Sequence, residues 1–330
     1  MAFDNVTKEF KIGKYSIPSR IILPPMATGK SPDGSVTEKL LEYYKKLAEN
    51  PYIGIIMTEH SYVNIQGKAH DNQLSADGTA DASTFKKLTE IIHTAKKGTL
   101  AIQQISHAGN KASEKWTHSE ILGPSDDMNK DEKVRAMTIS EIESLEEDFV
   151  SAAKRAEEYG FDGIELHAAH GYLLSQFYSP ITNRRDDEYG ASSVENRVRI
   201  ITEIIEKTKK AVSPDFLVGL RFGACDRQAD GSGATVEDAV KAAEFFEKAG
   251  ADFIDISAGV DGVITPKDPK KRFPGFFKDE SKIIRDAVNV PVFTCGGVKK
   301  IAEADELIKD GYADMIGIGR ALLAKADLSE

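Results

Sequence analysis

The chain has 330 residues, of which 41% are hydrophobic and 29% charged, a balance typical of a globular protein. Its 53 acidic and 43 basic residues give a net charge of −10, which repels a phosphate backbone and argues against nucleic acid as a main partner. Two distant cysteines exclude a disulfide framework or zinc ribbon. Because the N-terminus has no apolar core and no apolar stretch is long enough to span a membrane, we expect a soluble, cytoplasmic protein.

Short apolar runs alternate with amphipathic segments along the whole chain, after a predicted hairpin over Phe10–Pro18. The runs suit parallel strands buried on both faces. They are Ile21–Met26, Ile53–Thr58, Leu100–Ile105, Gly163–His167, Leu217–Phe222, Phe253–Ser257, Val292–Cys295 and Met315–Ile318. Helical periodicity covers Thr37–Glu49, Ser83–Lys97, Ser140–Tyr159, Ser193–Val212, Thr235–Ala249, Lys278–Val288 and Lys299–Lys309. Eight strands alternating with helices predict a closed barrel or an open doubly wound sheet.

The connections between these elements favour the barrel. Helix-to-strand links are short and share a glycine, at Gly160, Gly250 and Gly311, which suits the left-handed turn that ends a helix. Strand-to-helix links are long and polar, as on the active-site face of a barrel; they are residues 107–139, 168–192, 223–234 and 258–277. We therefore predict an α/β fold, a (β/α)8 TIM barrel with an N-terminal hairpin and long βα loops, as a single domain over residues 1–330.

The end of the fourth predicted strand carries His167, His170 and Tyr172. Two neutral imidazoles could hold a carbonyl oxygen and stabilise the negative charge that develops on it. The Tyr172 phenol could then supply a proton. Two other interpretations stay open at this point: a metal pair, because His-x-x-His can chelate, and histidines that only hydrogen-bond within the structure.

The last two predicted strands each end in glycines. Gly296 and Gly297 follow the seventh strand, and Gly319 precedes Arg320 after the eighth. Backbone N–H groups at such glycines can approach a phosphate, and the arginine can neutralise it. Together the two loops predict a phosphate site.

Two polar side chains interrupt apolar strands. Arg221 in the fifth strand requires a partner, either a buried carboxylate or an anionic ligand group. Gln104 in the third strand could pair with the edge of a heteroaromatic ring or with backbone.

The sequence closely resembles the Old Yellow Enzyme family of FMN-dependent NADH:flavin oxidoreductases. The resemblance is carried by residues 160–180, followed by 183–190 and 195–197, and continues in 24–26, 64–68, 104–109 and the two glycine loops. It spans the chain from about Ile21 to Leu323. It implies an FMN at the top of a (β/α)8 barrel and NADH or NADPH as the reductant.

The resemblance also implies roles for individual residues. Pro24, Pro25, Met26 and Ala27 would line the isoalloxazine, and the backbone of His60 would meet it. Gln104 would bond the pyrimidine edge, Arg221 would lie near N1 and the C2 carbonyl, and Gly296, Gly297, Gly319 and Arg320 would hold the phosphate. An α,β-unsaturated carbonyl substrate would place its oxygen between His167 and His170, receive hydride from flavin N5 at its β-carbon, and be protonated by Tyr172 at its α-carbon. No metal ligand is implied, and a homo-oligomer is compatible with the sequence.

One departure from the family pattern supports an alternative. Ala27 stands where family members usually carry threonine or cysteine. The chain could therefore be a flavin-binding scaffold, or a nonspecific quinone or flavin reductase with weak ene-reductase activity. A metal-dependent barrel hydrolase that uses His167 and His170 is a third hypothesis.

Overall fold

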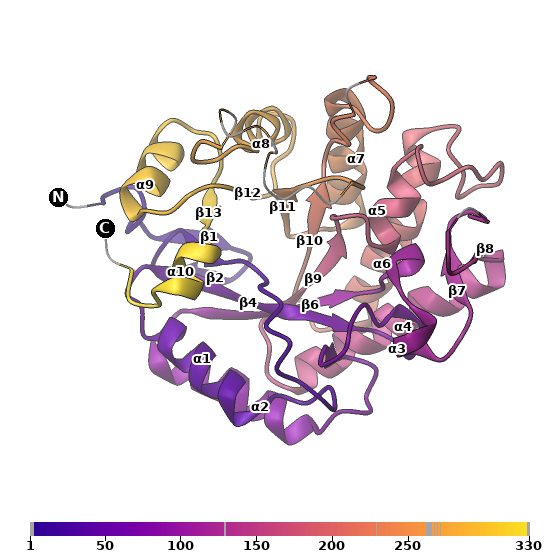
Figure 1. Ribbon diagram of the computed structural model, residues 1–330. Coiled ribbons are helices and arrows are strands. Elements are labelled where there is room, and N and C mark those ends of the chain that lie inside the picture. Colours follow the sequence, from indigo (N-terminus) through magenta and orange to yellow (C-terminus); the bar gives the residue numbers. More distant parts are fainter. Residues whose placement is uncertain are drawn as a thin grey trace.

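Eight parallel strands form a closed barrel surrounded by helices (Figure 1). The computed structural model describes residues 3–328 apart from 129, 229, 262–265, 267, 269 and 271, so part of the 258–277 loop lies outside the described residues. The barrel strands are β3 (Ile21–Leu23), β4 (Ile53–Tyr62), β6 (Leu100–Ser106), β9 (Gly163–Ala168), β10 (Leu217–Gly223), β11 (Phe253–Ser257), β12 (Val292–Thr294) and β13 (Met315–Gly317). The pairings of β3 with both β13 and β4 close the sheet, so the prediction of a barrel is confirmed.

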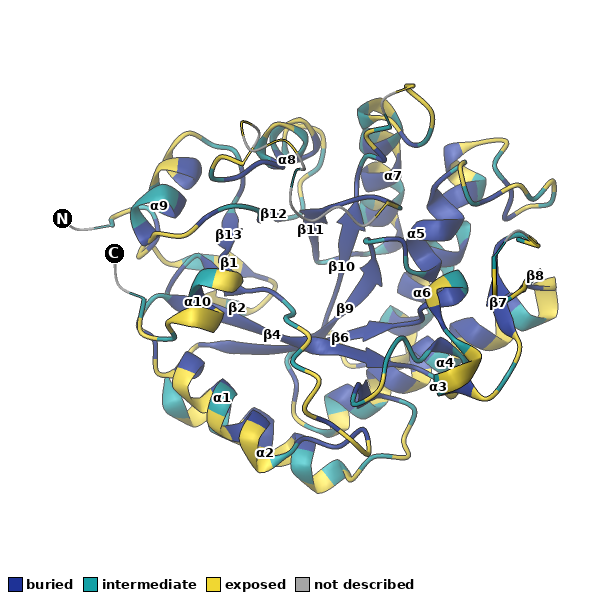
Figure 2. Ribbon diagram, viewed as in Figure 1, coloured by how far each residue is buried: buried dark blue, intermediate teal, exposed yellow. Residues whose placement is uncertain are grey.

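A helix follows each barrel strand and packs outside it. These helices are α1 (Glu38–Ala48), α2 (Ala82–Ala95), α4 (Ile139–Glu158), α6 (Val194–Ala211), α7 (Val236–Ala249), α8 (Lys278–Arg285), α9 (Ile301–Lys309) and α10 (Arg320–Ala324). In Figure 2 the barrel strands are buried, whereas the helices around them expose one face and bury the other, as their amphipathic sequences require. No helix in the described part of the chain is long and apolar enough to cross a membrane.

The predicted N-terminal hairpin covers one end of the barrel. Strands β1 (Phe10–Ile12) and β2 (Tyr15–Ile17) pair antiparallel, and Gly13 turns between them with a φ of 54°. The side chains of Ile12 and Ile17 are buried in one cluster with inward-facing residues of the barrel, among them Phe253. Apolar burial therefore holds the hairpin against the barrel floor, away from the carboxyl ends of the strands.

The short helix-to-strand turns share a second feature besides their glycine. Gly160, Gly250 and Gly311 all have positive φ, as predicted. Each glycine is followed within three residues by an aspartate whose carboxylate accepts a backbone N–H at the start of a neighbouring strand: Asp162 from Ala101, Asp252 from Val218 and Asp314 from Val292. The repeated Gly–Asp pattern thus satisfies buried backbone donors on this end of the barrel.

Several boundaries differ from the prediction. Strand β3 ends at Leu23, because the prolines that follow it have no N–H for the ladder. Strand β4 continues to Tyr62, four residues past the predicted end. Helix α4 is capped by Thr138, whose hydroxyl and Glu141 form a reciprocal capping box, and it begins at Ile139, one residue before the predicted segment.

The long βα loops contain elements that the periodicity did not reveal. They are the 3-10 turns η1 (Ile65–Gly67) and η2 (Gly109–Lys111), the strands β5 (Leu74–Ser75), β7 (Ile121–Gly123) and β8 (Val134–Ala136), and the helices α3 (Glu114–Thr117) and α5 (Leu173–Tyr178). All are seven residues or fewer, too short for a clear period. They make an ordered rim around the carboxyl ends of the barrel strands.

Candidate active site

The residues expected at a flavin site all lie at the carboxyl ends of barrel strands. Residues 24–27 follow β3, His60 lies near the end of β4, Gln104 is in β6, His167 is in β9 with His170 and Tyr172 just after it, Arg221 is in β10, Gly296 and Gly297 follow β12, and Gly319 and Arg320 follow β13. Because all eight strands are parallel, these positions share one face of the barrel. The structure therefore brings together the set that the sequence pointed to.

The rings of His167 and His170 face each other at the end of β9, at the mouth of the barrel. His167 Nε2 lies 3.1 Å from His170 Nδ1, and His170 Nε2 lies 2.7 Å from the Ser257 hydroxyl. His170 has a φ of 57°, an unusual backbone conformation that turns its ring back toward His167. Burial lowers the pKa of both imidazoles well below the usual value of 6.5, so both are neutral at physiological pH. We call these two residues the oxyanion pair.

The Tyr172 ring packs against His167. Its centroid lies 4.5 Å from that of His167, and burial raises the pKa of the phenol to about 12. The phenol is therefore fully protonated near neutral pH. A protonated phenol beside two neutral imidazoles is a suitable arrangement for holding a carbonyl oxygen and delivering a proton.

His60 contributes a side chain that the sequence analysis did not use. Its ring centroid lies 5.4 Å from Tyr172 and 6.0 Å from His167. Gln73 Nε2 donates to His60 Nδ1 at 2.8 Å, and burial lowers the pKa of His60 to about 3. The imidazole is thus a fixed, neutral wall of the site, where the resemblance had implied a role for the backbone alone.

Below the oxyanion pair lie four buried polar side chains, which we call the polar layer: Gln104, Glu165, Arg221 and Asp255. Gln104 Nε2 donates to Glu165 Oε2 at 2.7 Å. Glu165 is thus a partner of this amide group in addition to the two that the sequence suggested, a ring edge or backbone. Arg221 Nε lies 3.5 Å from Asp255 Oδ2, so the arginine has the buried carboxylate partner that was one of its two expected options.

The charges of the polar layer follow from its burial. Burial and the nearby Asp255 raise the pKa of Glu165 well above its usual value, and burial also raises that of Asp255. Although burial opposes its charge, Asp255 and its other neighbours raise the pKa of Arg221. Since Asp255 is the carboxylate closest to Arg221, we assign the ion pair to these two and the retained proton to Glu165.

The alternation of side chains along a strand is the feature of the sequence that could have identified Glu165 and Asp255 as inward-facing residues. Side chains two apart on a strand share a face, so Glu165 must point inward with His167, and Asp255 with Ser257 and Phe253. All of these residues are buried, as an inward position requires.

The glycine after β13 approaches the segment after β3. A Cβ added to Gly319 would lie 2.9 Å from Met26 Sδ and 3.3 Å from Pro24 Cγ. Gly296 and Gly297 have φ values of 101° and 75°, which L side chains rarely adopt. The contacts of Gly319 place the end of β13 beside residues expected to line the flavin, whereas Gly296 and Gly297 pack against Phe276.

Arg320 has an exposed side chain. Among the described residues, its guanidinium has no hydrogen-bond or ion-pair partner. A cation without a protein partner beside glycine-rich backbone suits an anionic ligand group.

Thr28 does not replace the side chain missing at Ala27. Its backbone N–H and hydroxyl both bond to the Glu59 carboxylate, at 2.8 and 2.9 Å. Burial raises the pKa of Glu59, with Thr28 acting in the opposite direction. Because the Thr28 hydroxyl is committed to Glu59, the flavin edge near position 27 has no hydroxyl or thiol from this segment.

The arrangement fits a bound FMN. Gly296, Gly297, Gly319 and Arg320 could hold an anionic group, and Arg221 is a buried cation whose Nε makes no hydrogen bond among the described residues. By contrast, no group of three or more His, Cys, Asp or Glu side chains in the described residues could hold a metal ion.

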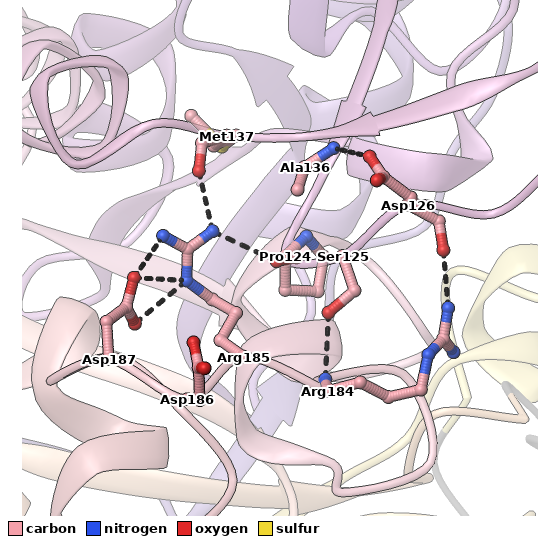
Figure 3. Close-up of a pocket in the computed structure, with 9 residues that line it drawn as sticks. All are labelled: Pro124, Ser125, Asp126, Ala136, Met137, Arg184, Arg185, Asp186 and Asp187. Carbon is pink, nitrogen blue, oxygen red and sulfur yellow. Dashed lines mark hydrogen bonds and ion pairs between the residues drawn. The ribbon is translucent and has the colours of Figure 1, made fainter.

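A separate surface hollow of about 420 Å³ includes none of these residues (Figure 3). Its centre is Arg185, which donates to the carbonyls of Pro124 and Met137 and pairs with Asp187. Arg184 also donates to the Asp126 carbonyl. The residues around this hollow tie the segment after α5 to the β7–β8 ribbon, which is a structural role.

Comparisons with known proteins agree with the geometry of the barrel mouth. Residues 7–330 match the model of the NADH:flavin oxidoreductase / NADH oxidase family. An NADH oxidase of Thermoanaerobacter brockii is 38% identical over 98% of the chain and 50% of its own length. An NADPH dehydrogenase of Bacillus subtilis (strain 168) is 33% identical over 94% of the chain and 89% of its own length.

The fold is likewise that of solved members. The Old Yellow Enzyme homologue of Zymomonas mobilis superposes with a TM-score of 0.81 at 25% identity, over 98% of the chain and 90% of the homologue. The chain spans about half the length of the T. brockii relative. The match to the family model, over residues 7–330, nevertheless includes every strand of the barrel and every residue of the candidate site. The chain therefore belongs to the NADH:flavin oxidoreductase / NADH oxidase family, the family of Old Yellow Enzyme.

Proposed function

We propose that this protein is an FMN-dependent, NAD(P)H-consuming ene-reductase for α,β-unsaturated carbonyl compounds. The observation that carries the proposal is the oxyanion pair, with its facing nitrogens 3.1 Å apart, beside the protonated phenol of Tyr172. Neutral imidazoles can both donate to one oxygen without carrying a charge of their own, and they stabilise the enolate-like charge that forms during reduction.

The flavin would be held along the strand ends. Pro24, Pro25, Met26 and Ala27 would line its ring system, with the His60 backbone and Gln104 at its edge. Arg221 would face the N1 end, and Gly296, Gly297, Gly319 and Arg320 would hold the phosphate. When bound, FMN would accept hydride from NADH or NADPH and supply it from N5 to the substrate β-carbon.

The chain's own residues would then complete the reduction. His167 Nε2 and His170 Nδ1 would donate to the substrate carbonyl oxygen, which polarises the conjugated double bond. Tyr172 would transfer its phenolic proton to the α-carbon, and solvent would return a proton to the phenolate. The fixed His60 ring would limit the room beside Tyr172 and orient the substrate.

The test begins with the flavin. The purified protein should contain FMN or take it up from solution, and a cyclic enone should rapidly reoxidise the enzyme after reduction by NADPH or NADH. His167→Ala and His170→Ala should each weaken the binding of a para-substituted phenol and slow reoxidation by the enone. A protein that cannot be loaded with FMN, or variants with unchanged phenol binding, would contradict the proposal.

A second candidate function rests on position 27. Ala27 stands in place of a residue with a hydroxyl or thiol, and the Thr28 hydroxyl is bonded to Glu59. The protein could therefore be a nonspecific quinone or flavin reductase with weak ene-reductase activity, or a flavin-binding scaffold. For a quinone reductase, a quinone would reoxidise the reduced protein rapidly. Adding a cyclic enone would then not raise the reoxidation rate above that measured without any added acceptor.

A further inference from the structure

The oxyanion pair can bind a ligand oxygen only in one protonation pattern. The facing atoms are His167 Nε2 and His170 Nδ1, so both must carry hydrogen for both to donate. A neutral imidazole has one N–H, so the opposite nitrogen of each ring must then be bare. In the ligand-bound state His170 Nε2 can therefore accept a hydrogen bond but cannot donate one.

Ser257 is the group that faces His170 Nε2, at 2.7 Å. Its side chain lies at the end of β11, is only 2% exposed, and so has little access to water. A carboxylate or a backbone carbonyl at this place could only accept, and would hold the proton on Nε2. A hydroxyl can donate, which leaves the His170 proton on Nδ1, facing the ligand.

Without a ligand, the preferred pattern is the reverse. The two facing nitrogens cannot both carry hydrogen when they lie 3.1 Å apart. His167 Nδ1 is buried and has no partner in the described structure, and a bare nitrogen there costs less than an unpaired N–H. His167 then donates from Nε2 to His170 Nδ1, and the His170 proton lies on Nε2, donated to Ser257.

We propose that Ser257 is a positioning residue that adapts to both states: its hydroxyl accepts from His170 when the oxyanion pair is free and donates to it when a ligand oxygen is bound. The change moves one proton of His170 from Nε2 to Nδ1 and rotates the serine hydroxyl, with no net gain or loss of protons. This inference rests on the proposed function, because it assumes that the oxyanion pair holds the substrate oxygen.

The surroundings of Ser257 are suited to a rotating hydroxyl. Cys295 Sγ lies 3.9 Å from Ser257 Oγ, and Arg221 donates to the same sulfur at 3.3 Å. The thiol can donate weakly to the serine oxygen or accept from it. Ser257 therefore has a permissive second partner in either orientation, and through Cys295 it connects the oxyanion pair to the cation of the polar layer.

The experiment compares phenol binding with the tautomer of His170. Calorimetry on the FMN-loaded protein measures the dissociation constant of a para-substituted phenol, and ¹⁵N NMR of labelled histidines reports which nitrogen of His170 carries hydrogen. Ser257→Ala leaves an unpaired N–H on His170 in the free state but only a bare nitrogen in the bound state, so phenol binding should become tighter by about threefold to tenfold. Ser257→Thr, which keeps the hydroxyl, should return the affinity to that of the parent.

Ser281→Ala is the matched control, because this serine is also buried but bonds to the Phe277 carbonyl and the Thr294 hydroxyl, and among the described residues it makes no hydrogen bond to either histidine. It should leave phenol binding unchanged. In the unmodified protein, phenol should shift the His170 proton from Nε2 to Nδ1. Phenol binding in Ser257→Ala that is less than twofold tighter than in the parent, or a His170 that keeps its proton on Nε2 with phenol bound, would overturn the inference.

The two hypotheses fail in different ways. If phenol binding does not depend on His167 or His170, the proposed function fails and this inference with it. If binding depends on both histidines but not on Ser257, only the role of Ser257 is refuted.

Discussion

Replacing Tyr172 with phenylalanine tests the proton donor while preserving the shape of the site. The variant keeps the aromatic ring that packs 4.5 Å from His167 and 5.4 Å from His60, and removes only the hydroxyl. A positioned general acid contributes about 100-fold to 10,000-fold to a rate. Since Tyr172 is only partly buried, water can replace part of its function, and we expect reoxidation by an enone to slow about 100-fold.

The raised pKa of Tyr172 adds a pH signature with a definite sign. An unperturbed phenol with a pKa of 10 is about one quarter protonated at about pH 10.5, whereas a phenol with a pKa of about 12 is still about 97% protonated. Burial favours the neutral acid, so proton donation persists to higher pH. The Tyr172-dependent rate should therefore stay flat to about pH 11.

Stopped-flow absorbance at the flavin band separates the two half-reactions. Reduction by the nicotinamide should change less than twofold in Tyr172→Phe, because no proton from the phenol is needed in that step. Tyr178→Phe is the matched control, since this tyrosine is fully buried and donates to the Ala224 carbonyl. Equal slowing of both half-reactions, or a loss of the Tyr172-dependent rate near pH 10, would refute the reasoning.

Three further predictions concern the cofactor and the fold. Arg320→Ala should weaken FMN binding at least tenfold, because a charge-assisted phosphate contact is lost; fluorescence titration of the apoprotein measures this, and an unchanged affinity would remove Arg320 from the phosphate site. Gly219→Ala should destabilise the fold by about 1–3 kcal/mol in urea unfolding, because its Cβ would lie 2.3 Å from the Phe253 ring, and a neutral result would mean that the barrel relaxes there. The hydrogen bond to Asp162 raises the pKa of His93, so protonated His93 stabilises the fold fully below about pH 6.5, and this contribution disappears as pH rises through the folded-state pKa. His93→Gln should therefore destabilise more at about pH 5.5 than at about pH 8.5, and equal losses at both would contradict the assignment.

The barrel could be predicted from the sequence because its signals are local. A buried parallel strand needs a continuous apolar run, and each short return turn needs a residue that tolerates positive φ, as at Gly160. Boundaries were less predictable, because they depend on contacts distant in sequence. Strand β4 continues to Tyr62 because Ser61 and Tyr62 pair with β5 and β6 beyond a register shift at Glu59 and His60, which no local pattern indicates.

The same difference between local and distant contacts applies to the residues of the candidate site. His167, His170 and Tyr172 could be identified because a polar cluster at the end of an apolar strand is visible in a single segment. The partners that set their chemistry come from other strands: Ser257 from β11 and Cys295 from the loop after β12. Pairing residues across strands requires the register of the sheet, and a sequence alone does not supply it.

Strand β11 shows why that register matters for the chemistry. Asp255 and Ser257 point to the same face because they are two residues apart, and each has its own partner: Arg221 for the carboxylate and His170 for the hydroxyl. Register pairs Asp255 with Arg221 on β10, and on its other side Arg221 pairs with His167 on β9. A shift of one residue would turn both side chains outward, leaving Arg221 buried without a countercharge and His170 without a donor. Charge balance in the polar layer and the protonation of the oxyanion pair therefore depend on one structural variable, the alignment of β11 with its neighbours.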